Sequence, residues 1–306
     1  MKNKQFILTL TLLILSSCGD NKYKEKDPNA VETMNSGHVT IAVDNDVYSV
    51  IDTGISMYSE DYKKVLVNQI NVTAREAMGE LLNGNVRIAV IARDYLHDED
   101  SLMKSFKVKE HQRMKIATDG LVLFCNREFP IDTLNITQVK DIFQNGKKLS
   151  SFFKVNGDVK YYVNEANSSV FANFKKLILE DKPLGTTLNY EKDSKAVLEQ
   201  VSKSKGSVGI GYLSQVLSDD RFKMIEIGYY DSTGAYVSPK PVHQGYIVQG
   251  KYPFPVSIWV YLLEDRRNLP FWFASYLAKE NKYQKVILDK GIVPEFARFQ
   301  LVPESK

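Results

Sequence analysis

Hydrogen-bond donors stand at three points of the sequence where a helix is expected to begin or a strand to end. Thr73 precedes one amphipathic run, Asn167, Ser168 and Ser169 precede another, and Arg93 follows an apolar strand. Hydroxyls, the amides at a helix start and a guanidinium group all donate hydrogen bonds, and converging donors of this kind bind small oxyanions without a metal ion. These residue types therefore indicate an anion site, provided that the fold brings the three points together.

The same residues also have structural interpretations, which stay open. Thr73, Asn167 and Ser168 are good helix caps whether or not a ligand is present, and the segment 73–76 has the spacing of a capping box. Arg93 lies close in sequence to several acidic residues. A surface ion pair is therefore as good an explanation for Arg93 as a ligand contact.

Residues for the common hydrolytic and metal-dependent chemistries are missing or badly spaced. The sequence has no Gly-x-Ser-x-Gly or His-Glu-x-x-His segment, and its four histidines, at 38, 97, 111 and 243, lack metal-site spacing. Of the two cysteines, Cys125 lies in an apolar run, so we expect it to be buried and unreactive. The sequence predicts neither an enzyme nor a metal or other cofactor.

The first residues have the pattern of an export signal. Lys2 and Lys4 precede an apolar stretch from Phe6 to Leu15, which is too short to span a bilayer as a stable helix. Leu15-Ser16-Ser17-Cys18 then resembles the lipobox of bacterial lipoproteins. We expect a signal peptide over residues 1–17 and a lipid on Cys18; the alternative is an ordinary secretory signal that happens to contain a cysteine. No later apolar run is long enough for a membrane span.

Composition narrows the class of protein further. Residues 18–37 are polar and predict a lipidated tether, and the 289 residues that follow the signal peptide exceed the usual size of one domain. With 43% hydrophobic and 25% charged residues, the chain has enough apolar residues for a sizeable core. A net charge of only +3 argues against nucleic-acid binding, which normally needs a basic surface.

Strand and helix patterns alternate through the body of the chain. Apolar or alternating runs predict strands at 39–43, 69–72, 86–91, 121–125, 159–163 and 207–212. Amphipathic runs predict helices at 58–68, from Thr73 to about Gly84, at 134–143, from Asn167, and at 196–201, 271–277 and 282–289. This alternation predicts an α/β fold with mostly parallel sheets.

Several segments, taken in order, resemble one known family. The most specific is 117–126 followed by 134–143, where the family has an Asp-Gly/Ala strand, an Asn and a Leu-Thr-x-x-Gln-Leu-x-x-Ile-Phe helix. Weaker matches lie at 86–93, 164–169, 206–212, 252–255 and 285–294. The ordered set, from about Val39 to Val302, is similar to the phosphate-type solute-binding proteins of ABC importers, within the type II periplasmic binding protein superfamily.

The resemblance implies a two-lobed fold, in which each lobe is a mostly parallel sheet flanked by helices and two strands cross between the lobes. Lobe one would combine residues 38–120 and 236–306, and lobe two would be residues 121–235. Ligand would be captured in the cleft between them. The implied ligand-binding residues are Tyr48, Ser49, Thr73, Arg93, Asp119, Asn167, Ser168 and Ser169. Structural roles stay open for two of them. Tyr48 is alternatively a core residue, and Asp119 alternatively binds amides of the hinge and no ligand.

Two glycine-rich loops of that family are absent from this chain. Residues 71–74 and 166–169 stand in their places, and the family's Arg before the second loop is missing. Glycines there would let the backbone approach an anion closely. We therefore expect a monomeric, membrane-anchored protein that captures a small anion, plausibly phosphate, for an ABC importer permease. The alternative is an accessory or sensor lipoprotein of the same fold that binds another small ligand or a protein partner.

Overall fold

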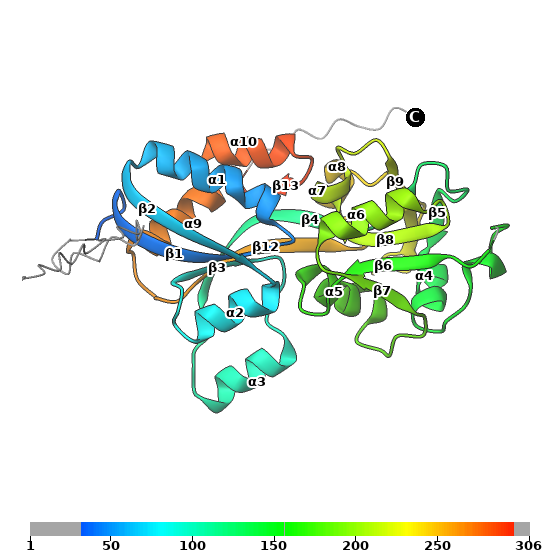
Figure 1. Ribbon diagram of the computed structural model, residues 1–306, viewed down its shortest axis with the longest axis horizontal. Coiled ribbons are helices and arrows are strands. Elements are labelled where there is room, and N and C mark those ends of the chain that lie inside the picture. The colour runs from blue at the N-terminus through cyan, green and yellow to red at the C-terminus, as the bar shows by residue number, and fades with distance from the viewer. Residues whose placement is uncertain (1–31, 156, 297–306) are drawn as a thin grey trace, which may run out of the picture. The chain divides into compact units, whose positions relative to one another are not determined.

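Ten strands form one continuous mixed sheet in the computed structural model, which describes residues 32–155 and 157–296 (Figure 1). Their order is β2-β1-β3-β12-β4-β8-β6-β7, and β13 and β9 also pair with β4. These strands are β1 (Ser36–Asp44), β2 (Lys64–Val72), β3 (Ile88–Ile91), β4 (Gln112–Asn126), β6 (Lys160–Asn164), β7 (Leu188–Glu191), β8 (Ser207–Tyr212), β9 (Phe222–Met224), β12 (Pro255–Leu262) and β13 (Val293–Pro294). A separate small sheet has the order β11-β10-β5, with β5 (Thr133–Asn135), β10 (Glu226–Tyr230) and β11 (Tyr236–Val237).

Strand β4 belongs to both halves of the large sheet. Its first part pairs with β12 as far as Gly120, and its second part pairs with β8 from Leu121 onwards. On one side β1 is parallel to β2 and β3, and on the other β6 is parallel to β7 and β8. We call the β1, β2, β3 and β12 side, with its helices, lobe one, and the β6, β7 and β8 side lobe two.

Helices cover both faces of each lobe (Figure 1). In lobe one, α1 (Tyr48–Asp61) and α9 (Leu269–Lys279) lie on one face with α10 (Asn281–Asp289), and α2 (Ala74–Leu82) lies on the other. In lobe two, α5 (Ser169–Phe174), which continues into the π-helix η2 (Lys175–Leu179), and α6 (Ser194–Lys203) pack on opposite faces. The remaining helices are α3 (His97–Ser105), α4 (Ile136–Phe143), the 3₁₀ turn η1 (Leu149–Ser151), α7 (Leu213–Val216) and α8 (Gln244–Val248).

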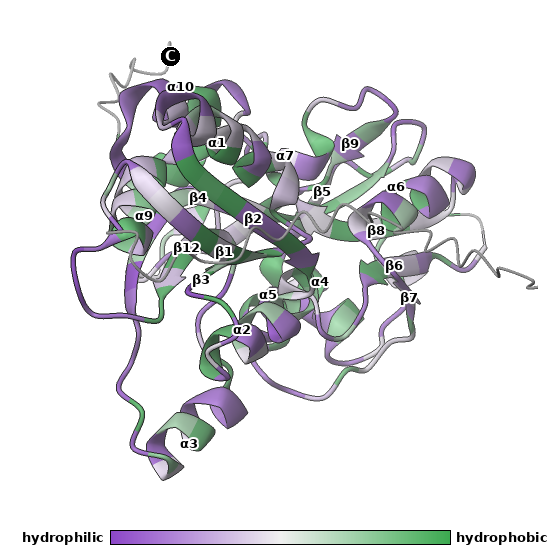
Figure 2. Cartoon of the chain, turned by 60° about the vertical axis from the view of Figure 1, so that its left-hand side comes forward, coloured by the Kyte–Doolittle hydropathy of each residue, from purple (hydrophilic) through white to green (hydrophobic). Residues whose placement is uncertain are grey.

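The core follows from this layering. Residues 41–43 of β1 and all of β3 are fully buried between helices, which explains their nearly continuous apolar sequence. Helix α3 is the opposite case: it is mainly hydrophilic (Figure 2), and only Glu99 and Met103 of it are buried. The Cys125 side chain is buried in β4, and burial raises the pKa of its thiol to about 12, as expected for an unreactive core residue.

The helix predicted over residues 58–68 is confirmed only as far as Asp61 and is wrong beyond it. Helix α1 begins ten residues earlier, at Tyr48, and ends at Asp61, and residues 64–72 form β2. This segment is rich in valine and isoleucine, which favour strands, and it pairs in parallel with β1 from Ser36–Lys64 to Asp44–Val72. The helix predicted over 134–143 is shorter, because Leu134 belongs to β5 and Asn135 caps α4.

The predicted signal peptide over 1–17 and Cys18 lie outside the described residues, as does most of the tether. Among the residues that the structure does describe, no helix has the length and apolar character needed to cross a bilayer. The residue boundaries that the sequence suggested for the two lobes stay a prediction.

Candidate functional site

The carboxyl ends of two strands of lobe one and one strand of lobe two meet at one place. Strands β1, β3 and β6 end at Asp44, Ile91 and Asn164. In open α/β sheets, ligands bind just beyond the carboxyl ends of the strands. At this place Asp46, from the segment between β1 and α1, contacts side chains of lobe two.

The Asp46 carboxylate accepts four hydrogen bonds from lobe two. Its Oδ1 accepts from Asn164 Nδ2 and from Ser194 Oγ at 3.1 Å. Its Oδ2 accepts from Ser169 Oγ at 3.2 Å and from the Val170 amide at 3.0 Å. We call these four donors the Asp46 socket. A carboxylate offers about four lone-pair positions, so the socket saturates it.

Gln215, on α7, holds both the socket and the Asp46 backbone in place. Its Nε2 donates to Ser194 Oγ at 2.8 Å and to the Asp46 carbonyl at 2.7 Å. Ser194 Oγ also accepts from Asn164 Nδ2 at 2.9 Å. With both of its lone pairs engaged, the Ser194 hydroxyl directs its own proton to Asp46.

A second buried carboxyl group, Asp44, lies next to Asp46. Its Oδ1 accepts from the Asp46 amide at 3.1 Å and its Oδ2 from the Ala92 amide at 3.3 Å. Burial, together with the nearby charge of Asp46, raises the pKa of Asp44 to about 7. Burial also raises the pKa of Asp46, although the four donors of the socket oppose this effect. The site therefore favours one negative charge over two.

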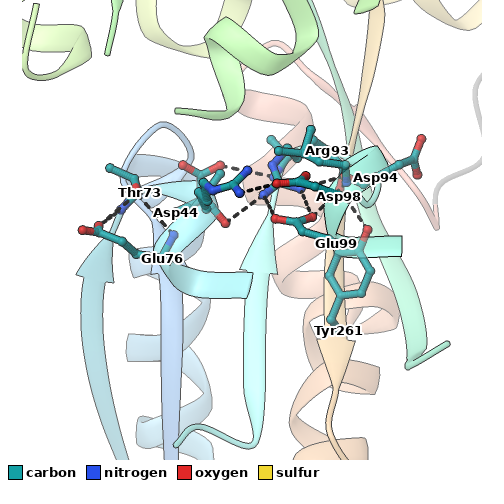
Figure 3. A network of polar contacts seen from close by, with 12 residues as sticks. Asp44, Thr73, Glu76, Arg93, Asp94, Asp98, Glu99 and Tyr261 are labelled. Carbon is teal, nitrogen blue, oxygen red and sulfur yellow. Dashed lines mark hydrogen bonds and ion pairs between the residues drawn. The ribbon is translucent and has the colours of Figure 1, made fainter. Parts of the chain in front are cut away.

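Arg93 is engaged inside lobe one (Figure 3). Its guanidinium donates to both carboxylate oxygens of Glu99, at 2.8 and 2.7 Å, and to the carbonyls of Asp94 and Ala74 at 2.9 and 3.3 Å. The side chains of Arg93 and Glu99 are only 3% and 7% exposed. The ion pair considered for Arg93 therefore exists, but it is buried and its partner is Glu99.

Comparison with known proteins identifies the family. The sequence model of a PBP (periplasmic binding protein) superfamily domain matches residues 28–281. The chain belongs to the PBP superfamily. This confirms the two-lobed α/β fold expected from the resemblance, with β4 passing from one lobe of this PBP chain to the other.

Solved structures share the fold at low sequence identity. A phosphate-bound protein from Clostridium perfringens, assigned as the substrate-binding component of a phosphate ABC transporter, is 15% identical, with a TM-score of 0.69 over 84% of this chain and 99% of its own. An ABC-type phosphate transport receptor from Vibrio cholerae is 17% identical, with a TM-score of 0.65 over 84% and 100%. The regulatory domain of CcmR from Synechocystis PCC6803, in complex with 2-PG, is 11% identical, with a TM-score of 0.54 over 79% and 96%.

Three candidate residues of this PBP chain lie at helix starts. Thr73 forms a complete capping box with Glu76: Thr73 Oγ1 accepts from the Glu76 amide at 3.3 Å, and Glu76 accepts from the Thr73 amide at 2.9 Å. Ser168 caps α5 by accepting from the Phe171 amide at 3.1 Å. Asn167 is exposed, and its carbonyl accepts from the Arg75 amide of lobe one at 3.1 Å. The side chains of Thr73 and Ser168 therefore perform the capping role, Asn167 contacts lobe one through its backbone, and the next residue, Ser169, belongs to the socket.

The other candidates are more scattered. Tyr48 is 37% exposed, so it is not a core residue, and its hydroxyl donates to Asp52 in the same helix at 3.1 Å. Ser49 is exposed on α1. Asp119 is fully buried in β4 and accepts from the amides of Gly120 at 2.7 Å and Ser214 at 3.2 Å. Burial raises the pKa of Asp119 to about 6. Asp119 thus binds amides where β4 passes between the lobes.

A pocket of about 460 Å³ is lined by residues of both lobes. Its lining includes the aromatic residues Tyr95 and Phe171 and the basic residues Arg75 and Lys176. Lys176 forms an exposed ion pair with Asp94 across the lobes, at 2.9 Å. The pocket shares α5 with the Asp46 socket, but Asp46 and its four donor residues do not line it.

The sequence analysis missed Asp46, Asn164 and Ser194, although a signal for two of them was present. Asp46 stands shortly after the predicted strand 39–43, and Asn164 stands directly after the predicted strand 159–163. Polar residues at the carboxyl ends of parallel strands are candidates for a ligand site. Within the described part of the chain, no group of three or more His, Cys, Asp or Glu side chains is arranged to hold a metal ion.

Proposed function

We propose that this PBP-superfamily protein is an extracytoplasmic solute-binding protein that captures a small oxyanion between its lobes. One observation carries the proposal: the Asp46 socket, in which Asn164, Ser169, Val170 and Ser194 direct four uncharged donors at one oxyanion group. Uncharged donors in a buried site stabilise a negative charge strongly, because little water competes with them. The phosphate bound by the Clostridium perfringens relative makes phosphate the first solute to test.

The proposal includes the membrane anchor and the transporter. Cys18 would carry the lipid after removal of residues 1–17, and the tether would keep the body close to the membrane. The solute would then pass to the permease of an ABC importer, as the descriptions of the Clostridium and Vibrio relatives suggest. In this role the protein binds its solute and does not transform it.

A second candidate function is that of a sensor or accessory lipoprotein. It is favoured by a specific feature of the socket, namely that a side chain of the same chain already satisfies its four donors. The CcmR regulatory domain shares the fold and was solved with 2-PG bound, so a regulatory ligand is compatible with this architecture. Such a protein would bind phosphate weakly or not at all.

The deciding experiment uses residues 19–306, which lack Cys18, and titrates phosphate, sulfate, molybdate and a set of organic anions by calorimetry and thermal shift. A solute at one hundred times its Kd stabilises the folded state by about 2.7 kcal/mol. Ser169→Glu should weaken oxyanion binding by about a hundredfold or more, because it adds a like charge inside the socket. Ser101→Glu makes the same change on the exposed surface of α3 and should leave binding unchanged. If none of the oxyanions binds, the importer role is refuted in favour of the sensor or accessory role.

A further inference from the structure

The Asp46 socket joins the two lobes through a single side chain. Asp46 belongs to lobe one, between β1 and α1, whereas Asn164, Ser169 and Ser194 belong to β6, α5 and α6 of lobe two. Asp46 is only 4% exposed. The carboxylate therefore lies where the lobes meet, with its donors all on the opposite side.

An oxyanion and the Asp46 carboxylate cannot use the socket at the same time. Each Asp46 oxygen already accepts two hydrogen bonds, and the Ser194 proton is directed to Asp46 because its oxygen lone pairs are engaged by Asn164 and Gln215. Two negatively charged groups placed together in the socket would also repel each other, because the site is buried. A solute that uses the socket must therefore displace Asp46.

Few other polar contacts between the lobes are as well shielded from water. Asn173 donates to the Ala92 carbonyl at 2.6 Å in a buried position. The ion pair between Lys176 and Asp94 has both side chains about half exposed, so it adds little to closure. Asp46 accepts four hydrogen bonds from lobe two, three of them buried and the one from Ser194 partly buried, and thus provides the largest group of interlobe hydrogen bonds at this place.

Asn164, the last residue of β6, also fits Asp46 as the group that occupies the socket. Asn164 donates to Asp46 through its side-chain amide, so this donor is uncharged. Uncharged donors can bind the Asp46 carboxylate and then release it. When Asp46 leaves the socket, no unpaired positive charge stays buried there.

We propose that Asp46 is an internal ligand: its carboxylate occupies the oxyanion position of the socket, holds the lobes together, and competes with the solute. The competition rests on the proposed function, whereas the closure of the lobes does not. A tethered competitor acts at a high effective concentration, so it raises the solute concentration needed for binding. A small monocarboxylate such as acetate offers the socket the same group as Asp46 without the tether, so it does not displace Asp46, whereas a tetrahedral oxyanion such as phosphate brings more oxygen atoms than a carboxylate and can displace it.

The first test measures closure without any solute. Spin labels at Lys63→Cys in lobe one and Lys205→Cys in lobe two, both exposed, report the interlobe distance in residues 19–306. Asp46→Ala should add a population at longer distance. Asp132→Ala, which removes an exposed carboxylate that pairs with Lys223, should not. If Asp46→Ala leaves the distance distribution unchanged, the internal ligand is refuted.

The second test titrates phosphate and acetate into the same variants. Asp46→Ala should bind phosphate at least about tenfold more tightly than the wild type, and it should gain measurable affinity for acetate. Asp46→Ser, which keeps a small polar side chain, replaces Asp46→Ala if the alanine variant does not fold. Equal or weaker phosphate binding by the variant overturns the competition. If Asp46→Ala opens the lobes and no variant binds an oxyanion, the internal ligand stands and the oxyanion function is refuted.

Discussion

Replacing Arg93 by methionine tests whether this residue is structural. The Arg93 guanidinium donates two hydrogen bonds to the Glu99 carboxylate and two to backbone carbonyls, all within lobe one. Arg93→Met keeps most of the apolar stem and removes the charge. It leaves Glu99, whose side chain is 7% exposed, with the Leu96 amide at 2.8 Å as its remaining donor.

The expected cost follows from this burial. Removing one partner of a buried ion pair leaves an uncompensated charge and typically costs about 3–5 kcal/mol of unfolding free energy. The double variant Arg93→Met/Glu99→Gln removes both charges and keeps an oxygen that can accept from the Leu96 amide. It should cost clearly less than Arg93→Met alone, which gives a coupling energy of about 2 kcal/mol or more between the two positions.

Equilibrium urea unfolding at pH 7 measures these values. Lys104→Met serves as the control, because it removes a charge from α3 whose ion pair with Asp100 is exposed, and it should cost about 0.5 kcal/mol or less. A cost below about 1 kcal/mol for Arg93→Met would refute the reasoning. Loss of oxyanion binding by the folded double variant would make Arg93 a ligand contact, as the resemblance suggested.

Two further predictions concern Asp44 and the packing of β8. The folded-state pKa of Asp44, about 7, lies above its unfolded value of about 3.9, so folding favours the protonated carboxyl group. The free energy of unfolding should therefore fall as pH rises from about 4 to about 7, by at most about 1.4 kcal/mol per pH unit. Urea midpoints measured across this pH range should change less in Asp44→Asn than in the wild type. Gly209→Ala should destabilise by about 1–3 kcal/mol in thermal or urea unfolding, because its Cβ would lie 2.3 Å from the Phe124 ring, whereas Gly206→Ala, with no atom within 4 Å, should change stability by about 0.5 kcal/mol or less. A costly Gly206→Ala would contradict the packing explanation.

Local features of this protein could be predicted from the sequence, because the residues that form them lie close together in the chain. The capping box of Thr73 and Glu76 spans four residues, and Ser168 caps α5 through the amide three residues later. The strand at 207–212 was also predicted correctly, because its apolar residues are bounded by turn residues. The strand predicted at 69–72 is confirmed, but residues 64–68 were misassigned to a helix because their strand character depends on pairing with β1, 28 residues earlier in the chain.

The sequence by itself determined the α/β class and the superfamily, because the alternation of strands and helices and the ordered set of motifs can both be recognised without the tertiary structure. The Asp46 socket was decided only by the tertiary structure. Its donors lie 118 to 148 positions from Asp46, and they meet it only because β4 brings the carboxyl ends of β1 and β6 together. The tertiary structure also decided that Arg93 pairs with Glu99 in the interior of lobe one and not at the surface, because a buried charge is stable only where another charge meets it.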